Sequence, residues 1–307
     1  MTEPRFIGVY PILPTPFNDD EVLDTEAFAG IIRFMVDVGV DGVTILGVLG
    51  EANRMVDAER SKLIETAVAT ADGRIPIIVG TSHSGTQATI ELSHIAHKLG
   101  AAGVMVTPHR EPTPNTQRIY DHFARIADAI ELPIILQDHP ISTQVHMPLD
   151  LVLRMVAEID RVSCIKQEAV PSPARVAALV AGMTTRKLPI LTGLGALYGG
   201  YELARGADGF MTGFAFPEVL MAMVIAAQND DHNRVMDIYT RYLPLIVFEG
   251  QPGVAIRKDI FRQRGLMASS QVRHPGGNID DGSRSQLEST LARTFGNQDI
   301  TQPITVE

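Results

Sequence analysis

A lysine closes a short apolar segment near the middle of the chain. Residues 162–166 read Val-Ser-Cys-Ile-Lys, and Glu168 follows two positions later. An amine in an apolar environment loses part of its preference for the charged form and can attack a ketone carbon to give a Schiff base. In an extended chain Lys166 and Glu168 share a face with Cα atoms about 6.6 Å apart, so Glu168 is placed to pair with the ammonium or to act as a base beside the imine. The alternative is a lysine that only forms an ion pair or extends its charged end into solvent.

Two further segments end in groups suited to binding a small acid. Residues 47–51 read Gly-Val-Leu-Gly-Glu, and the two glycines allow backbone N–H groups to face a carboxylate, although such turns are also common connectors. Residues 137–140 read Gln-Asp-His-Pro, which is polar for the end of a strand, and Pro140 favours an extended conformation at His139.

Other candidate groups favour structural roles. His94 and His97 stand three apart on a predicted helix face and could share a metal ion, but no third ligand is placed nearby, so a solvated helix face is favoured. Gly193 precedes a helix and could help hold a phosphate, but a tight loop with a backbone carbonyl near the substrate is preferred. Cys164 is expected to pack inside the fold rather than act as a nucleophile. The sequence implies no metal and no organic cofactor.

The elements that must position these groups alternate between strand length and helix length. Strand candidates such as residues 77–79 and 133–136 are apolar at consecutive positions, which is typical of parallel strands buried on both faces. The predicted strands are 6–13, 42–48, 76–81, 103–107, 133–137, 162–166, 188–192 and 209–212. The predicted helices are 25–38 with Asp24 as N-cap, 58–71, 86–99, 116–130, 148–158, 173–183, 195–205 and 217–227.

Eight such units favour an α/β fold that closes into a (β/α)8 TIM barrel. A doubly wound open sheet is the alternative, but the first strand runs into Pro11, Pro14 and Pro16 rather than into a glycine-rich phosphate turn. After residue 228 the strand rhythm stops, and residues 233–248, 254–265 and 284–295 have a helical pattern. We therefore expect a catalytic barrel over residues 1–228 and a small C-terminal helical subdomain over 229–307, with a flexible tail from Gly296.

Composition limits the function classes. The chain has 307 residues, 45% hydrophobic and 20% charged, with a formal net charge of −10 and no basic block. Nucleic-acid and anionic-membrane binding are therefore disfavoured. The single cysteine excludes an internal disulfide and fits a reducing compartment, and neither a signal peptide nor a membrane-spanning run is recognised. A cytoplasmic protein is expected.

The strings described above resemble those of the dihydrodipicolinate synthase / N-acetylneuraminate lyase family. Residues 47–51 are similar to the family's Gly-Thr-Thr-Gly-Glu motif, and the spacing to Lys166, to Val-Thr-Pro at 106–108 and to Gly193 also matches. The resemblance covers about residues 6–265. It implies a (β/α)8 barrel, a Schiff-base lysine at Lys166, a substrate carboxylate held near residues 48–49, and commonly a homotetramer.

Departures from the family pattern concern the end of the substrate that reacts. Gln137 stands where members that condense or cleave pyruvate have a tyrosine, and an amide has no titratable proton. Val48 and Leu49 replace two hydroxyl residues, His109 and Arg110 replace an aromatic pair, and Ser142 replaces the arginine that binds the synthase's second substrate. These differences argue against lysine-pathway synthase activity.

Several short strings are instead similar to the branch that includes 2-keto-3-deoxy-arabonate dehydratase, although the Gly50-Glu51 turn is closer to the synthase. The strings are Gln-Asp-x-Pro at 137–140, Lys-x-Glu at 166–168, Met-Thr-Gly at 211–213, Phe-Pro at 216–217 and Arg-His-Pro at 273–275.

We therefore predict a lyase that forms a Schiff base with a small 2-oxo acid, with a 2-keto-3-deoxy sugar acid as the preferred substrate and dehydration or aldol cleavage as the reaction. The alternatives are condensation of pyruvate with aspartate semialdehyde and a non-catalytic relative that binds 2-oxo acids. A homo-oligomer, tetramer or dimer, is expected. The predicted catalytic residues are Lys166, Glu168 and Gln137. The predicted substrate-binding residues are Gly47, Val48, Leu49, Glu51, His83, His109, Asp138, Gly193 and Met211.

Overall fold

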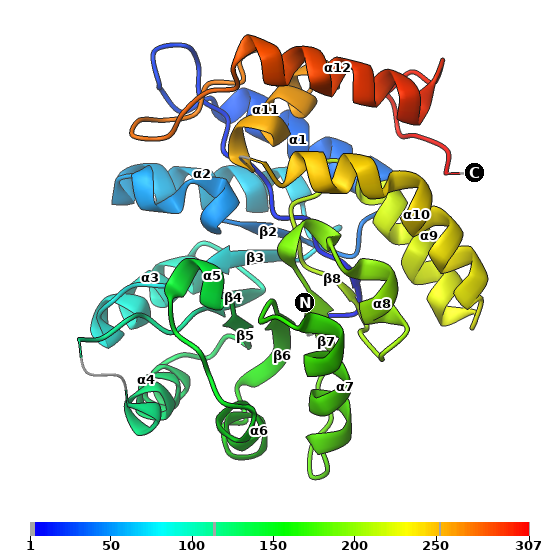
Figure 1. Cartoon of the computed structure of the whole chain (residues 1–307). Helices are drawn as coiled ribbons and strands as arrows, with labels where there is room; N and C mark the ends of the chain where they lie inside the picture. Colours follow the sequence, from blue (N-terminus) through cyan, green and yellow to red (C-terminus); the bar gives the residue numbers. More distant parts are fainter. Residues whose placement is uncertain (1–3, 113–114, 252, 307) are drawn as a thin grey trace.

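Eight parallel strands form a barrel in the computed structural model, which describes residues 4–112, 115–251 and 253–306 (Figure 1). The hydrogen-bonded strand order is β1-β8-β7-β6-β5-β4-β3-β2. An isolated bridge between Ile12 and Thr44 joins the two ends of this series, with Thr44 N–H donating to the Pro11 carbonyl at 2.8 Å. The predicted (β/α)8 architecture is confirmed.

The strands are short, and nearly all of their residues are buried, which explains the consecutive apolar runs in the sequence. Their bounds are β1 Gly8–Val9, β2 Val43–Ile45, β3 Ile77–Gly80, β4 Gly103–Val106, β5 Ile134–Asp138, β6 Val162–Gln167, β7 Ile190–Thr192 and β8 Gly209–Phe210. The first strand is much shorter than predicted. Proline lacks a backbone N–H, so the chain beyond Val9, which carries Pro11, Pro14 and Pro16, cannot continue a full ladder.

Helices cover the outside of the barrel. Their bounds are α1 Thr25–Val38, α2 Asp57–Ala71, α3 Thr86–Lys98, α4 Thr116–Ala129, α5 Pro140–Thr143, α6 Leu149–Glu158, α7 Ser172–Gly182, α8 Gly199–Leu203 and α9 Pro217–Gln228. Three 3₁₀ turns add η1 Val48–Gly50, η2 Ala52–Arg54 and η3 Leu194–Ala196. The carboxylate of Asp24 accepts from the N–H of Ala27 at 2.9 Å, as predicted for an N-cap.

Two connections differ from the sequence prediction. The continuous helix predicted over 195–205 is wrong, because Gly195 has a φ of 67° within η3 and the helix α8 begins only at Gly199. The short helix α5 was not predicted; it begins at Pro140, whose fixed φ suits the first position of a helix.

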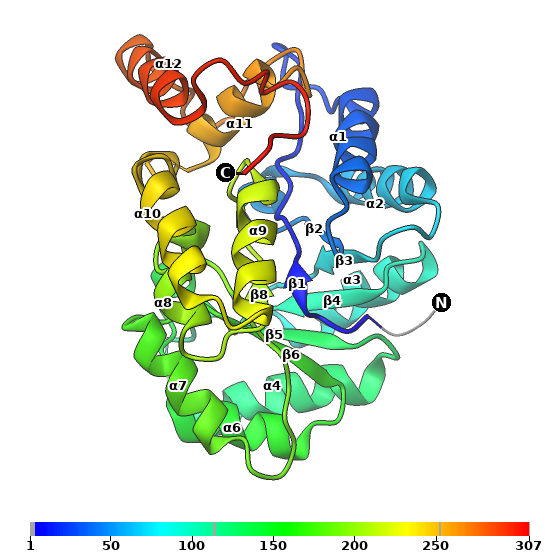
Figure 2. The ribbon, with the colours of Figure 1, turned by 90° about the vertical axis from the view of Figure 1, so that its right-hand side faces the viewer.

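Three further helices extend the barrel: α10 His232–Glu249, α11 Val254–Gln263 and α12 Asp281–Phe295. Helix α10 packs on α9, and α11 and α12 lie on the same side of the molecule as α1 (Figure 1, Figure 2). The residues after α12, for which the sequence shows no core pattern, contact α11: the guanidinium of Arg264 donates to the Ile300 carbonyl at 3.0 Å, and Ile304 is buried. Among the described residues, no helix is long and apolar enough to cross a membrane.

The core has two parts. The larger lies between the strands and the surrounding helices. The smaller fills the inside of the barrel and comprises Phe6, Tyr10, Ile12, Ile78, Met105, Ile135, Cys164, Leu191 and Met211, with Leu49 and Ala102 packed against it. A filled interior makes the barrel a solid support, and the groups available for chemistry are those at the carboxyl ends of the strands.

Candidate active site

Lys166 and Gln137 lie side by side at the carboxyl ends of neighbouring strands. The register of β5 and β6 pairs Gln137 with Lys166. Both side chains are buried, as is Glu168 just beyond β6. Parallel pairing of two short strands therefore brings together the three residues that the sequence predicts to be catalytic.

The Glu168 carboxylate is the centre of this cluster. Its Oε2 lies 3.3 Å from Nζ of Lys166 and accepts from Nε2 of Gln137 at 2.6 Å. Nδ1 of His139 is 3.9 Å from the same oxygen, and Oε1 accepts from the backbone N–H of Leu194 at 3.1 Å. Burial would raise the pKa of Glu168, but Lys166, His139 and the two hydrogen bonds together lower it below its ordinary value. The cluster therefore holds an ionised carboxylate beside the lysine amine.

The loop after β7 approaches Glu168 so closely that only glycine fits. A Cβ added to Gly193 would lie 2.0 Å from Oε1 of Glu168. This close approach lets Leu194 N–H reach the carboxylate. The sequence predicts that Gly193 brings a backbone carbonyl near the substrate. In the structure its N–H donates to the carbonyl of Gln167 at 3.3 Å, and its carbonyl accepts from the N–H of Ala196 at 2.9 Å.

The turn after β2 takes the form of a 3₁₀ turn that begins at Gly47. The N–H of Gly50 donates to the Gly47 carbonyl at 3.0 Å. The N–H groups of Val48 and Leu49, at the start of the turn, have no acceptor in the described part of the chain, as expected for the first donors of a helical turn. This geometry suits the predicted contact with a carboxylate.

Glu51 lies on the other side of that turn and is held by protein groups. It forms an ion pair with Lys258 of α11, and its Oε2 accepts from Arg54 at 2.8 Å and from the N–H of Arg273 at 2.9 Å. Glu51 and Lys258 are both fully buried, and burial lowers the pKa of Lys258 to about 8, although Glu51 opposes the shift. This geometry favours support of the turn by Glu51 over direct contact with substrate.

Asp138 faces away from Gln137, because successive residues of a strand point to opposite faces. Its Oδ2 accepts from Nη2 of Arg175 at 3.2 Å, and the same nitrogen donates to the Met147 carbonyl at 2.7 Å. Burial raises the pKa of Asp138 to about 6, with Arg175 opposing. The structure therefore places Asp138 against α7 and the loop before α6, and not in the Lys166 cluster.

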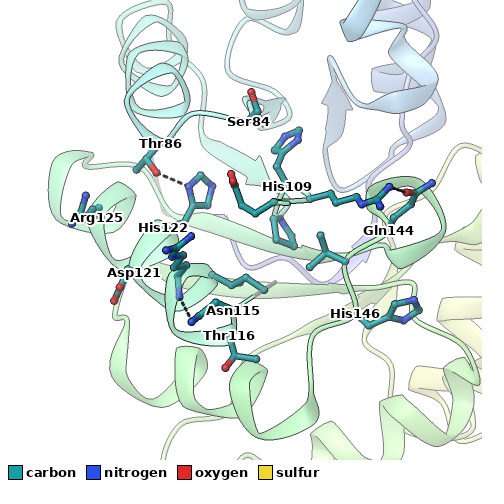
Figure 3. Close-up of a pocket in the computed structure, with 16 residues that line it drawn as sticks. Ser84, Thr86, His109, Asn115, Thr116, Asp121, His122, Arg125, Gln144 and His146 are labelled. Atoms are coloured by element: carbon teal, nitrogen blue, oxygen red, sulfur yellow. Dashed lines mark hydrogen bonds between the residues drawn. The ribbon is translucent and has the colours of Figure 1, made fainter. Parts of the chain in front are cut away.

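The predicted histidines lie apart from that cluster. His83 is exposed, and its Nδ1 accepts from the N–H of Gly85 at 3.0 Å. His109 is half-buried, with Nε2 unpartnered among the described residues, and burial followed by the neighbouring His83 lowers its pKa. His109 lines a cavity of about 630 Å³ between α4 and the loops after β4 and α5 (Figure 3). Met211 is fully buried inside the barrel and can support the site only from below.

Two other candidates can be placed in the structure. Cys164 is fully buried in the inner core, and burial raises the pKa of its thiol, so it packs as expected. His97 lies 4.0 Å from Glu131, and in the described part of the chain no group of three or more His, Cys, Asp or Glu side chains could hold a metal ion.

Sequence reasoning missed two groups near the catalytic cluster. His139 was noted only for its position before proline, and the donor N–H of Leu194 gave no side-chain signal. A second buried carboxyl, Glu202 on α8, also lies nearby and accepts from the hydroxyl of Ser172. Burial raises the pKa of Glu202 to about 7.

Comparison with known proteins agrees with the fold. A sequence profile of the dihydrodipicolinate synthetase family matches residues 5–294. The chain belongs to this family. It is therefore a lyase of the kind that acts through a Schiff base.

Individual relatives within the family carry two different names. L-2-keto-3-deoxyarabonate dehydratase of Azospirillum brasilense is 35% identical over 94% of this chain and 95% of its own length. A 4-hydroxy-tetrahydrodipicolinate synthase of Methanothrix thermoacetophila is 29% identical over 94% of this chain and 97% of its own length. The solved dihydrodipicolinate synthase of Rhodopseudomonas palustris has a TM-score of 0.89 at 32% identity, covering 94% of this chain and 98% of that one.

Proposed function

We propose that this chain dehydrates a 2-keto-3-deoxy sugar acid, with Lys166 as the Schiff-base residue and Glu168 as the base. The observation that carries the proposal is the position of the Glu168 carboxylate, 3.3 Å from Nζ of Lys166 and fixed by Gln137 and Leu194. A base held beside the imine nitrogen is within reach of the carbon next to the imine carbon, whose protons the iminium makes acidic.

The reaction proceeds in four balanced steps. The neutral Lys166 amine adds to C2 of the substrate, one proton is taken up from solvent and water leaves, giving an iminium; the proton returns to solvent in the final hydrolysis. A proton moves from C3 to Glu168, leaving an enamine. The enamine expels the C4 hydroxyl, which takes the proton from Glu168 and departs as water, so that C3 and C4 become doubly bonded. Hydrolysis of this conjugated iminium releases an unsaturated 2-oxo acid and restores Lys166.

Gln137 acts in this scheme by fixing the base. Its amide cannot titrate, but the 2.6 Å hydrogen bond to Glu168 holds the carboxylate in one orientation beside Lys166. Proton transfer is therefore assigned to Glu168 and not to the residue at position 137. The free N–H groups of Val48 and Leu49 would hold the substrate carboxylate.

The dehydratase relative from A. brasilense supports this choice of substrate. If the C3–C4 bond breaks instead of the C4–O bond, the same residues give an aldolase. Two features count against the synthase reaction. Gln137 supplies no titratable proton, and position 142 is a serine whose hydroxyl lies 2.7 Å from Nδ1 of His139.

The test is a panel of reactions on the purified protein. It should consume L-2-keto-3-deoxyarabonate or a stereoisomer of it and form a dehydrated 2-oxo acid, without releasing pyruvate. Pyruvate release, measured with lactate dehydrogenase, would show the aldolase instead. Turnover of pyruvate with aspartate semialdehyde, or no turnover of any 2-keto-3-deoxy acid, would contradict the proposal.

We also propose a cytoplasmic homo-oligomer, because the family resemblance implies a homotetramer and the single cysteine needs no oxidising compartment. Light scattering on the eluting protein would measure the number of subunits directly. A monomer over the working concentration range would contradict this part of the proposal.

A further inference from the structure

The cavity beside α4 is separate from the Lys166 cluster. It encloses about 630 Å³, enough for a small metabolite, between α4, residues 108–111 and residues 144–146 (Figure 3). Lys166, Glu168 and Gln137 are not among its lining residues. Of the residues predicted to bind substrate, only His109 lines it, so the catalytic cluster does not account for this space.

The lining of the cavity is positively charged, although the chain as a whole carries a formal charge of −10. The lining contains three arginines and two acidic residues. One of the acidic residues, Asp121, accepts a hydrogen bond from the amide of Gln117 at 2.7 Å. Arg110 donates to Gln144 at 2.7 Å. Arg118 and Arg125 form no ion pair or side-chain hydrogen bond with residues 4–112, 115–251 or 253–306. A concave positive site on an acidic protein attracts and concentrates small anions.

These two arginines, which have no charged partner among the described residues, flank a half-buried histidine on one face of α4. Positions 118, 122 and 125 fall on the same side of a helix, and Arg118 and Arg125 are separated by about 10 Å along its axis. Nδ1 of His122 lies 2.9 Å from the hydroxyl of Thr86 (Figure 3). Its Nε2 is buried with no partner in the described chain.

His122 is neutral near neutral pH. Burial, followed by the neighbouring His109, lowers its pKa to about 4. A neutral imidazole still offers one N–H, so the face presents two guanidinium groups with a polar ring between them. Guanidinium groups bind carboxylates through paired hydrogen bonds.

We propose that this cavity binds an extended small dicarboxylate, with one carboxylate on Arg118 and the other on Arg125. The separation of the two arginines along α4 fits a linear diacid better than a single compact dianion. The proposal does not depend on the reaction at Lys166, because the two groups of residues do not overlap.

Isothermal titration calorimetry at low ionic strength tests this directly, with glutarate as the extended probe and inorganic phosphate as the compact one. Glutarate should bind at one site per chain and more tightly than phosphate. Arg118→Gln and Arg125→Gln should each weaken glutarate binding at least tenfold. Arg33→Gln, which removes an exposed arginine from α1, is the matched control and should leave the affinity unchanged.

Further variants distinguish binding beside α4 from binding at the Lys166 cluster and from a change in assembly. Lys166→Ala should bind glutarate like the wild type, because Lys166 does not line the cavity. Circular dichroism melts show whether each variant is folded. If one arginine variant does not fold, the other alone tests the contribution of the arginines to glutarate binding. Absence of glutarate binding, tighter binding of phosphate, or binding that survives both arginine changes would overturn the proposal. So would a change of subunit number in the arginine variants without any glutarate binding, which would identify the face as a contact between copies of the chain.

Discussion

Replacement of Glu168 by glutamine separates its two possible roles, base or counter-ion. The substitution keeps the shape of the side chain and an oxygen for the N–H of Leu194, while the amide of Gln137 can turn over to meet the new amide. If Glu168 is the base, kcat for dehydration should fall by about 10²–10⁴-fold, which is roughly 2.7–5.5 kcal/mol of barrier. Lys166 should still form its imine.

The counter-ion role predicts a different result. The anion 3.3 Å from Lys166 favours the ammonium form, so its removal would leave imine formation unchanged or faster and turnover nearly intact. Steady-state rates and single-turnover borohydride trapping on the same substrate distinguish the two. Glu202→Gln is the matched control, because Glu202 is also buried but accepts a hydrogen bond from the hydroxyl of Ser172. Normal turnover in Glu168→Gln would refute the assignment of the base, whereas an equal loss in Glu202→Gln would point to a general effect of altering a buried carboxyl group.

Three other changes have outcomes that follow from the contacts. Gly193→Ala should lower kcat more than imine trapping, because its Cβ would displace a carboxylate oxygen 2.0 Å away; an unchanged rate would show that the loop moves freely. Lys258→Met should cost about 1–3 kcal/mol of unfolding free energy in denaturant titrations, because the buried Glu51 loses one of its two charged partners and keeps Arg54, and adding Glu51→Gln should restore part of the loss. For Asp138, a folded-state pKa of about 6 against an ordinary 3.8 means that burial costs stability as the carboxyl ionises. The free energy of unfolding of the wild type should therefore fall relative to that of Asp138→Asn as pH rises from about 4 to 6. A difference in unfolding free energy that does not change with pH would contradict the raised pKa of Asp138.

The sequence predicted the barrel because parallel strands buried on both faces leave consecutive apolar residues. It also placed Lys166 and Glu168 correctly on one face, since a two-residue spacing fixes the face without knowledge of the fold. Pairing of Gln137 with Lys166 depends on register between strands, and only the structure shows it. The break at Gly195 was missed because a glycine near the start of an apolar run does not reveal whether its φ is positive.

The sequence was less informative about residues whose partners come from distant segments. Glu51 belongs to a motif near the site, but its ion pair with Lys258 crosses most of the chain and could not be read from local spacing. Asp138 stands next to Gln137 in the sequence, yet strand alternation directs it to Arg175 on the outside. His109 lines the cavity beside α4, whose lining does not include Lys166, Glu168 or Gln137.

Borohydride reduction in the presence of pyruvate, followed by peptide mass mapping, tests the central claim most directly. The account predicts one reduced pyruvate adduct per chain, located on Lys166, and no adduct in a folded Lys166→Ala variant. Lys258 is the internal comparison, because it is also buried but forms its ion pair with Glu51 and not with Glu168. An adduct on Lys258 or any other lysine, or one that persists in Lys166→Ala, would contradict the assignment of Lys166 as the Schiff-base residue.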